Sequence, residues 1–85
     1  MNNLLEFPCD FPIKIIGLAD KTLLIETTNL LYKLCPKLNA ASISSRLSKN
    51  GKYLAVTAIL FAESKQQLDA IYRALTSDQR IKMVL

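Results

Sequence analysis

The chain has 85 residues, which leaves room for one small domain, and a net charge of +4. Hydrophobic residues make up 51% of it and charged residues 21%, which excludes a disordered segment. It contains no histidine, so Ser-His and Cys-His catalytic pairs and the commonest metal ligand are excluded. No apolar run reaches the roughly 18 residues of a membrane span and no secretion signal is visible, so we expect a cytoplasmic protein without a membrane partner. Because the chain begins at Met1, we also expect a complete gene product.

The first half of the chain predicts an arm, a strand and a helix. Residues 1–10 are expected to form an irregular N-terminal arm packed on a single domain of residues 11–85. Alternating apolar residues from Phe11 predict a strand that ends near Leu18. Asp20 is the expected N-cap of a helix that ends at about Cys35.

The second half predicts a hairpin, a helix and a last strand. Strands are expected over 43–48 and Tyr53–Ala62, joined by a type I′ turn in which Asn50 and Gly51 both have positive φ. Ser64 and Gln67 have the spacing of a capping box, which begins a helix that ends near Ser77. Residues 81–85 alternate again and predict the closing strand.

The order strand, helix, strand, strand, helix, strand predicts an α+β fold, the ferredoxin-like βαββαβ sandwich. In this fold two helices cover one face of a four-stranded antiparallel sheet, and the other face is open. The alternation assigns these residues to the helix-covered face: Ile13, Ile15, Val56, Ala58, Leu60, Ile81 and Met83.

The open face is the candidate ligand or partner surface. Its expected members are Lys14, Ile16, Leu18, Arg46, Thr57, Ile59, Phe61, Lys82 and Val84. Either the arm and loops cover its apolar residues, or the face self-associates or docks a partner. Its basic residues form a row across three strands that is either solvated or binds an anionic ligand or acidic partner.

Other chemistry is poorly supported. RNA-binding domains of this topology stack bases on strand aromatics, but Ala55 stands where the second ring of that motif is needed, so nucleic-acid binding is not expected. The serines lack a base and the carboxylates are scattered, so we expect no enzyme and no cofactor. Cys9 and Cys35 form no metal motif; a disulfide is conceivable, but reduced thiols fit a cytoplasmic protein better.

The whole chain resembles the YbeD-like family of small bacterial proteins. The resemblance rests on Leu4-Leu5-Glu6-Phe7-Pro8, on Phe11, Lys14 and Gly17, on Ser48-Lys49-Asn50-Gly51-Lys52-Tyr53, on Ile71-Tyr72 and Leu75, and on Lys82-Met83-Val84-Leu85. It implies a ferredoxin-like fold grouped with the ACT regulatory domains and a proposed lipoate-regulatory role. ACT domains commonly bind amino acids at the turn after the first strand, which matches Gly17-Leu18-Ala19-Asp20 here. The Asp-x-x-Gly pattern of ligand-responsive ACT domains is missing from this stretch, so Gly17 either lets a ligand approach or simply begins the turn.

Together these observations predict a non-catalytic regulatory or adaptor module that binds a small acidic effector or a protein partner. If lipoate is the effector, its carboxylate would pair with Lys14, Arg46 or Lys82, and its apolar part would lie on Ile16, Ile59 and Phe61. The alternative is a structural domain that forms a homodimer through its open sheet face or edge strands. Nucleic-acid binding driven by the positive charge is a weaker alternative.

Overall fold

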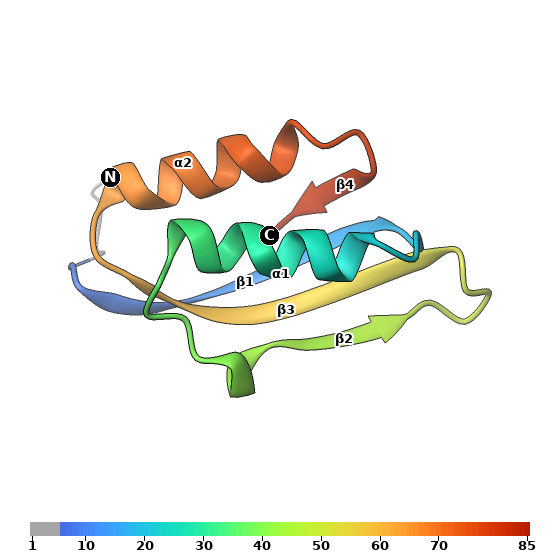
Figure 1. The fold of residues 1–85 in the computed structure, drawn as a ribbon, viewed down its shortest axis with the longest axis horizontal. Coiled ribbons are helices and arrows are strands. Elements are labelled where there is room, and N and C mark those ends of the chain that lie inside the picture. Colours follow the sequence, from blue (N-terminus) through green and yellow to red (C-terminus); the bar gives the residue numbers. More distant parts are fainter. Residues whose placement is uncertain (1–5) are drawn as a thin grey trace.

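The computed structural model describes residues 6–85 and confirms the βαββαβ order (Figure 1). The elements are β1 (Cys9–Leu18), α1 (Leu23–Leu34), the 3₁₀ turn η1 (Ala40–Ser42), β2 (Ser44–Leu47), β3 (Tyr53–Ala62), α2 (Lys65–Thr76) and β4 (Ile81–Val84). The sheet order is β2-β3-β1-β4, and every pairing is antiparallel. The expected arm lies partly outside the described residues, and β1 begins at Cys9 rather than Phe11, so residues 9 and 10 belong to the strand.

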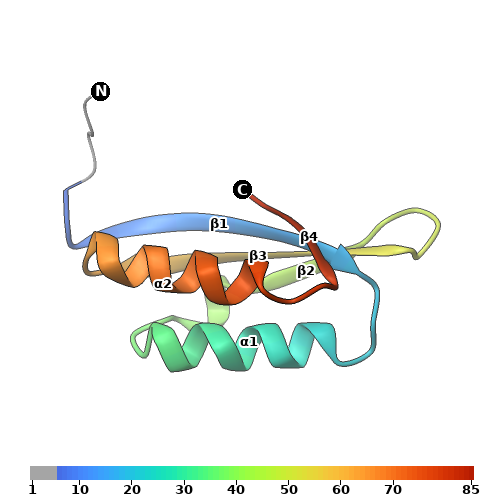
Figure 2. The same cartoon turned by 90° about the horizontal axis from the view of Figure 1, so that it is seen from above.

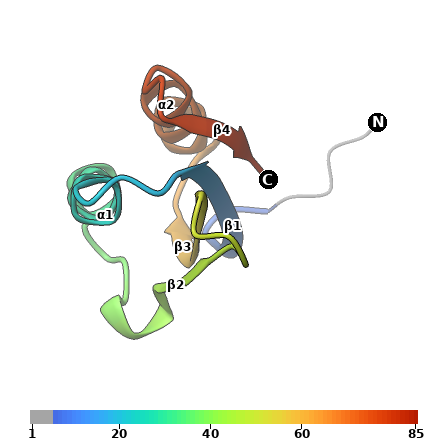
Figure 3. The same ribbon diagram turned by 90° about the vertical axis from the view of Figure 1, so that its right-hand side faces the viewer.

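Both helices lie on the same side of the sheet (Figures 2 and 3). The core between the layers is built from alternate residues of β1 and β3 and from one stripe of each helix. Its fully buried members include Ile13, Ile15, Val56, Ala58 and Leu60 from the sheet, and Leu23, Leu31, Ile71 and Leu75 from the helices. Each large side chain of this set stabilises the fold by about 1.5–3 kcal/mol through burial.

The two helices begin differently. Ser64 caps α2 as predicted, because its Oγ accepts the N–H of Gln67 at 3.1 Å. The prediction for α1 is wrong: its N-cap is Thr22, which makes no side-chain capping bond. Asp20 instead accepts the N–H and the hydroxyl of Thr22, both at 2.8 Å, and so shapes the turn before the helix.

The β2–β3 hairpin also differs from the prediction. Gly51, with φ of 72°, is the sole described residue with positive φ, so the turn is not type I′. Ser48 accepts the N–H of Gly51 on its backbone carbonyl at 2.9 Å, and Ser48 pairs with Tyr53 across the hairpin. The connection is therefore a longer loop in which one left-handed glycine follows an ordinary turn.

A β-bulge reverses the expected faces of the last two residues of β4, whereas Ile81 lies on the helix-covered face as predicted. Val84 pairs with Ile15 and Met83 with Ile16, but the register shifts before Ile81, which pairs with Gly17. Val84 therefore lies on the helix-covered side, and Met83, at 50% exposure, lies on the open face. Both assignments from simple alternation were wrong because the bulge inserts one extra residue, Lys82.

The central strands are longer than the outer ones. β1 and β3 have ten residues each, whereas β2 and β4 have four, so the ribbon of residues 9–13 and 58–62 has no strand on either side. Lys14 pairs with Leu85, so its backbone N–H and carbonyl point to the β4 edge of β1. Pro12, two residues earlier, lies on the same edge and has no N–H to offer another strand. On the other edge the hydroxyl of Ser42 accepts the N–H of Ile59 at 3.3 Å. Both devices make this ribbon a poor template for another strand.

Candidate functional site

The open face is a grid of cross-strand rows. Lys14, Thr57 and Ser44 form one row, and Ile16, Ala55 and Arg46 form the next. Two further rows extend the face toward the start of β1, with Pro12 beside Ile59 and Asp10 beside Phe61, and Leu18 beside Tyr53 ends it at the hairpin. The register thus brings together all the predicted face residues of β1, β2 and β3 on the side away from the helices.

Lys14 and Arg46 stand on either side of a depression that we call the basic hollow. It has a volume of about 320 Å³ and is lined by Lys14, Ser44, Ser45, Arg46, Ala55 and Thr57. The small side chain of Ala55 and the half-buried Thr57 belong to the central strand of the grid, so the hollow opens between the two longer cations. Two cations and nearby hydroxyls are the donor set that binds carboxylate or phosphate oxygens.

An apolar depression continues from the basic hollow toward the hairpin. It has a volume of about 200 Å³, and it shares Lys14, Arg46 and Ala55 with the basic hollow. Its other lining residues are Ile16, Leu47, Ser48 and Tyr53. The two depressions together offer a cationic end and a short apolar track, which suits a molecule with an acidic head and an apolar tail.

The ion pairs of the molecule leave the basic hollow unneutralised. Glu63 pairs with Lys37 at 3.3 Å and Asp69 with Lys65 at 3.1 Å. Three further carboxylates, those of Asp20, Glu26 and Asp78, gather around Arg80. Lys14 and Arg46 have no ion-pair partner within residues 6–85, so their positive charges are not neutralised by carboxylates of this part of the chain.

Arg80 holds the end of α2 against the start of α1. Its guanidinium donates to Asp78 at 2.7 Å, to the hydroxyl of Thr22 at 2.9 Å and to Glu26. The hydrogen bonds from Arg80 lower the pKa of Asp78 from 3.8 to about 2. Bonds from Thr22 are the main reason that the pKa of Asp20 is also lowered, and the carboxylates raise the pKa of Arg80.

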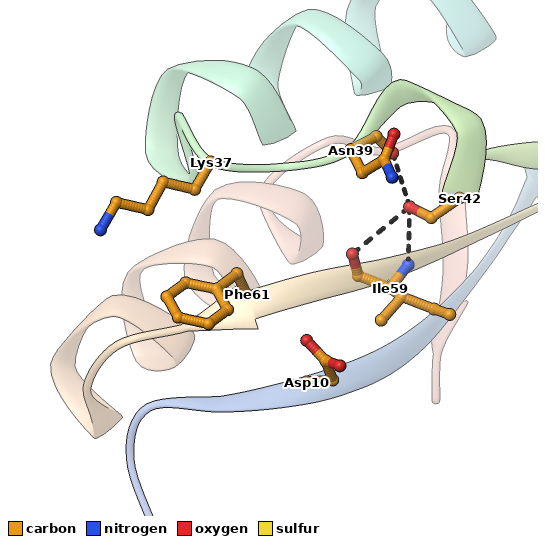
Figure 4. A pocket seen from close by; sticks show the side chains of 6 residues that line it. All are labelled: Asp10, Lys37, Asn39, Ser42, Ile59 and Phe61. Carbon is orange, nitrogen blue, oxygen red and sulfur yellow. Dashed lines mark hydrogen bonds between the residues drawn. The ribbon is translucent and has the colours of Figure 1, made fainter.

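A third depression, the Phe61 hollow, lies at the opposite end of the open face. It has a volume of about 440 Å³ and is lined by Asp10, Lys37, Asn39, Ser42, Ile59 and Phe61 (Figure 4). Ser42 donates to the carbonyl of Asn39 at 2.7 Å, and the ammonium of Lys37 lies 5.5 Å from the centre of the Phe61 ring. Ile59 and Phe61 were predicted for the open face, but the polar residues around them were missed. Lys37, Asn39 and Ser42 come from the loop after α1, and Asp10 was assigned to the arm although it belongs to β1. The spacing of Asn39 and Ser42, typical of a capped turn, is a signal that could have found the loop residues.

Besides Val84, two predicted site residues lie away from the open face. Lys82 is the bulged residue of β4 and lines a depression beside Tyr72 and Thr76 of α2, so the basic row has two members rather than three. Gly17 is buried and pairs with Ile81 under the first turn of α1. A β-carbon there would lie 2.8 Å from the carbonyl oxygen of Arg80, so the glycine permits close packing within the chain.

The thiols and carboxylates of the described chain form no metal centre. No group of three or more Cys, Asp or Glu side chains within residues 6–85 could hold a metal ion. Cys9 and Cys35 are free thiols, and the buried thiol of Cys35 donates to the carbonyl of Phe61 at 3.5 Å. Among the described helices, none has the length and apolar character needed to cross a membrane.

Sequence comparison finds relatives over almost the whole chain. A UPF0250 protein of Ralstonia nicotianae is 39% identical over 83 residues, covering 98% of this chain and 86% of the relative. A UPF0250 protein of Nitrosomonas europaea is 35% identical, with 98% of this chain and 95% of the relative covered. One of Neisseria gonorrhoeae is 40% identical over 86 residues, covering 98% and 91%.

Solved structures share the fold at low sequence identity. Protein HP0495 from H. pylori superposes with a TM-score of 0.78 at 14% identity, covering 99% of this chain and 88% of that one. The ACT domain from GTP pyrophosphokinase of Chlorobium tepidum superposes with a TM-score of 0.70 at 20% identity, covering 91% and 97%. The fold is therefore ACT-like, as the resemblance implied. The family model described as "Protein of unknown function (DUF493)" matches residues 2–85, so the chain belongs to this family, whose curated UPF0250 members are the YbeD-like proteins.

Proposed function

We propose that the protein is a non-catalytic regulatory module that binds a small acidic effector on its open sheet face. The observation that carries the proposal is the basic hollow, where Lys14 and Arg46 flank a depression of about 320 Å³ without an ion-pair partner in residues 6–85. A carboxylate between them would satisfy two cations at once, with the hydroxyls of Ser44 and Thr57 as further donors.

The apolar track beside the hollow restricts the effector further. A chain attached to the carboxylate would run over Ile16 and toward Tyr53, which is 37% exposed. Medium-chain acids such as octanoate and lipoate have this combination of head and tail, and the family resemblance to proposed lipoate regulators points to the same class. Ile59 and Phe61, which were predicted to bind the tail, lie beyond Thr57 in the Phe61 hollow and are not needed.

The fold and the side chains of the hollow support binding over catalysis. The ACT-like neighbour from Chlorobium tepidum is one domain of GTP pyrophosphokinase, and a separate ACT-like chain could regulate an enzyme by docking on it. The chain has no histidine, and the hollow contributes cations and hydroxyls, which are groups that hold an anion. Acidic side chains of a protein partner would use the same two cations.

Calorimetric titration with octanoate, lipoate and octylamine tests the proposal. The two acids are expected to bind, and octylamine, which has the same alkyl chain as octanoate and the opposite charge, is not. Lys14→Gln and Arg46→Gln should each weaken binding about tenfold, because each removes a charged hydrogen bond. Lys82→Gln is the matched control, since Lys82 is exposed on β4 beside α2, and should leave the affinity unchanged. Absence of heat with both acids at millimolar concentration would overturn the proposal.

A further inference from the structure

We propose that the open face also docks a second copy of this chain, face to face and with the strands of the two copies antiparallel. The two-fold axis would lie between the sheets, along the row of Pro12 and Ile59, perpendicular to the strands. This arrangement places Asp10 of each subunit against Lys14 of the partner subunit. It goes beyond effector binding, because the occupant is the protein itself.

The first support is apolar surface along the proposed axis. Pro12 and Ile59 lie on the axis, with Ile59 46% exposed, and Phe61, two residues from Ile59, is half-buried on the same face. Burying such residues against a second sheet is favourable by about 25 cal/mol per Å² of apolar surface.

The second support is the position of two charges on β1. Asp10 and Lys14 lie two residues to either side of Pro12, and both point to the open face. Both are exposed, and neither has an ion-pair partner within residues 6–85. Four residues along a strand span about 13 Å, so the two side chains of one subunit are too far apart to pair with each other.

The charges select one orientation of the two sheets. A two-fold axis across the strands exchanges the positions two residues before and after Pro12, so it brings opposite charges together twice. An axis along β1 would instead place Asp10 against Asp10 of the partner subunit and Lys14 against Lys14 of the partner subunit. Like charges at that distance are repulsive, so the antiparallel arrangement is favoured.

The geometry of the sheet is compatible with this interface. The open face is one of the two broad faces of a four-stranded sheet (Figure 2). Sheets packed in this way keep their strand directions within about 30° of each other, which retains the alignment of Asp10 with Lys14 of the partner subunit.

Sedimentation equilibrium of the purified chain and of a charge-swap series tests the dimer. The wild type should dimerise at low salt, and the dissociation constant of the dimer should increase as the salt concentration rises. Asp10→Lys and Lys14→Asp should each be monomeric, and the double variant D10K/K14D should recover the dimer because both pairs are restored with reversed sign. Ile59→Lys should also be monomeric, since two copies of the residue meet at the axis. Lys82→Asp, a charge reversal beside α2, should dimerise like the wild type.

Three outcomes would overturn the dimer: a monomeric wild type at millimolar concentration, single variants that still dimerise, or a double variant that stays monomeric. Circular dichroism of each variant checks the fold, which exposed positions should tolerate. The double variant also separates this proposal from effector binding. It has an aspartate in place of Lys14 and should lose affinity for octanoate, yet it should still dimerise.

Discussion

The carbonyl oxygen of Arg80 lies 2.8 Å from the position that a β-carbon on Gly17 would occupy. Cδ2 of Leu23 lies 2.9 Å from the same point, so β1, the first turn of α1 and the loop into β4 meet at this glycine. The N–H of Leu18 donates to the same carbonyl oxygen at 2.9 Å. Atoms of the chain itself therefore fill the space beside Gly17, in the turn where the ACT resemblance implies a ligand. The open face is the better candidate for a binding site.

Gly17→Ala is expected to destabilise the protein by about 1–3 kcal/mol, because a backbone oxygen on one side and a core leucine on the other leave no room for a methyl group. The measurement is the free energy of unfolding from urea titration. Gly51→Asn is the control: this position has positive φ, which asparagine tolerates, and nothing within 4 Å, so the change should stay within about 0.5 kcal/mol. Equal stabilities of the Gly17 variant and the wild type would contradict this account of the packing.

The Arg80 cluster predicts a loss of stability in acid. The pKa of Asp78 is lowered from 3.8 to about 2, so its contribution is present above pH 3.8 and disappears as pH falls through about 2. Asp20, whose pKa is also lowered, acts in the same direction. The urea midpoint of the wild type should fall as the pH is lowered from about 4 to about 2. The midpoint of Arg80→Gln should be lower than that of the wild type at pH 7 and should fall less over the same pH range. Parallel pH profiles for the two proteins would show that the cluster contributes little.

Most of the fold could be predicted from local patterns. Alternation in β3 and the Ser64–Gln67 capping box are properties of a few neighbouring residues, and both predicted elements are confirmed. The faces of β4 could not be predicted, because the bulge at Lys82 depends on its pairing with β1. The predicted N-cap of α1 was wrong for a similar reason. Asp20 accepts a hydrogen bond from Thr22 and another, at 3.4 Å, from Arg80, which is distant in the sequence.

Part of the candidate site could also be predicted from local patterns. Lys14 and Arg46 follow from alternation and antiparallel pairing, so their approach on the open face needed only the fold. The Phe61 hollow depends on the loop after α1, whose path is set by hydrogen bonds of Ser42 with Ile59 of β3 and with the carbonyl of Asn39. No periodicity records such contacts, which join residues 17 positions apart in the chain.

Ser42→Ala is expected to lower the free energy of unfolding by about 0.5–1.5 kcal/mol and to increase aggregation. The hydroxyl satisfies the N–H of Ile59 at 3.3 Å and the carbonyl of Asn39 at 2.7 Å, and its loss leaves the edge of β3 available to another strand. Urea titration and light scattering on prolonged incubation measure the two effects. Ser45→Ala is the matched control, because Ser45 is exposed on the short strand β2. Aggregation at the same rate in both variants would show that Ser42 does not protect the edge.

Octanoate is expected to shift the protein from dimer toward monomer. The ammonium of Lys14 faces both the basic hollow and the position proposed for Asp10 of the partner subunit, so a bound carboxylate and the partner compete for one cation. Sedimentation equilibrium with and without millimolar octanoate measures the shift, and octylamine is the control for the apolar chain. Arg46→Gln should reduce the shift without affecting the dimer in the absence of ligand, since Arg46 lies on β2 outside the Asp10–Lys14 pairs. If calorimetry shows octanoate binding while the dimer is unaffected, the acid lies elsewhere than at Lys14.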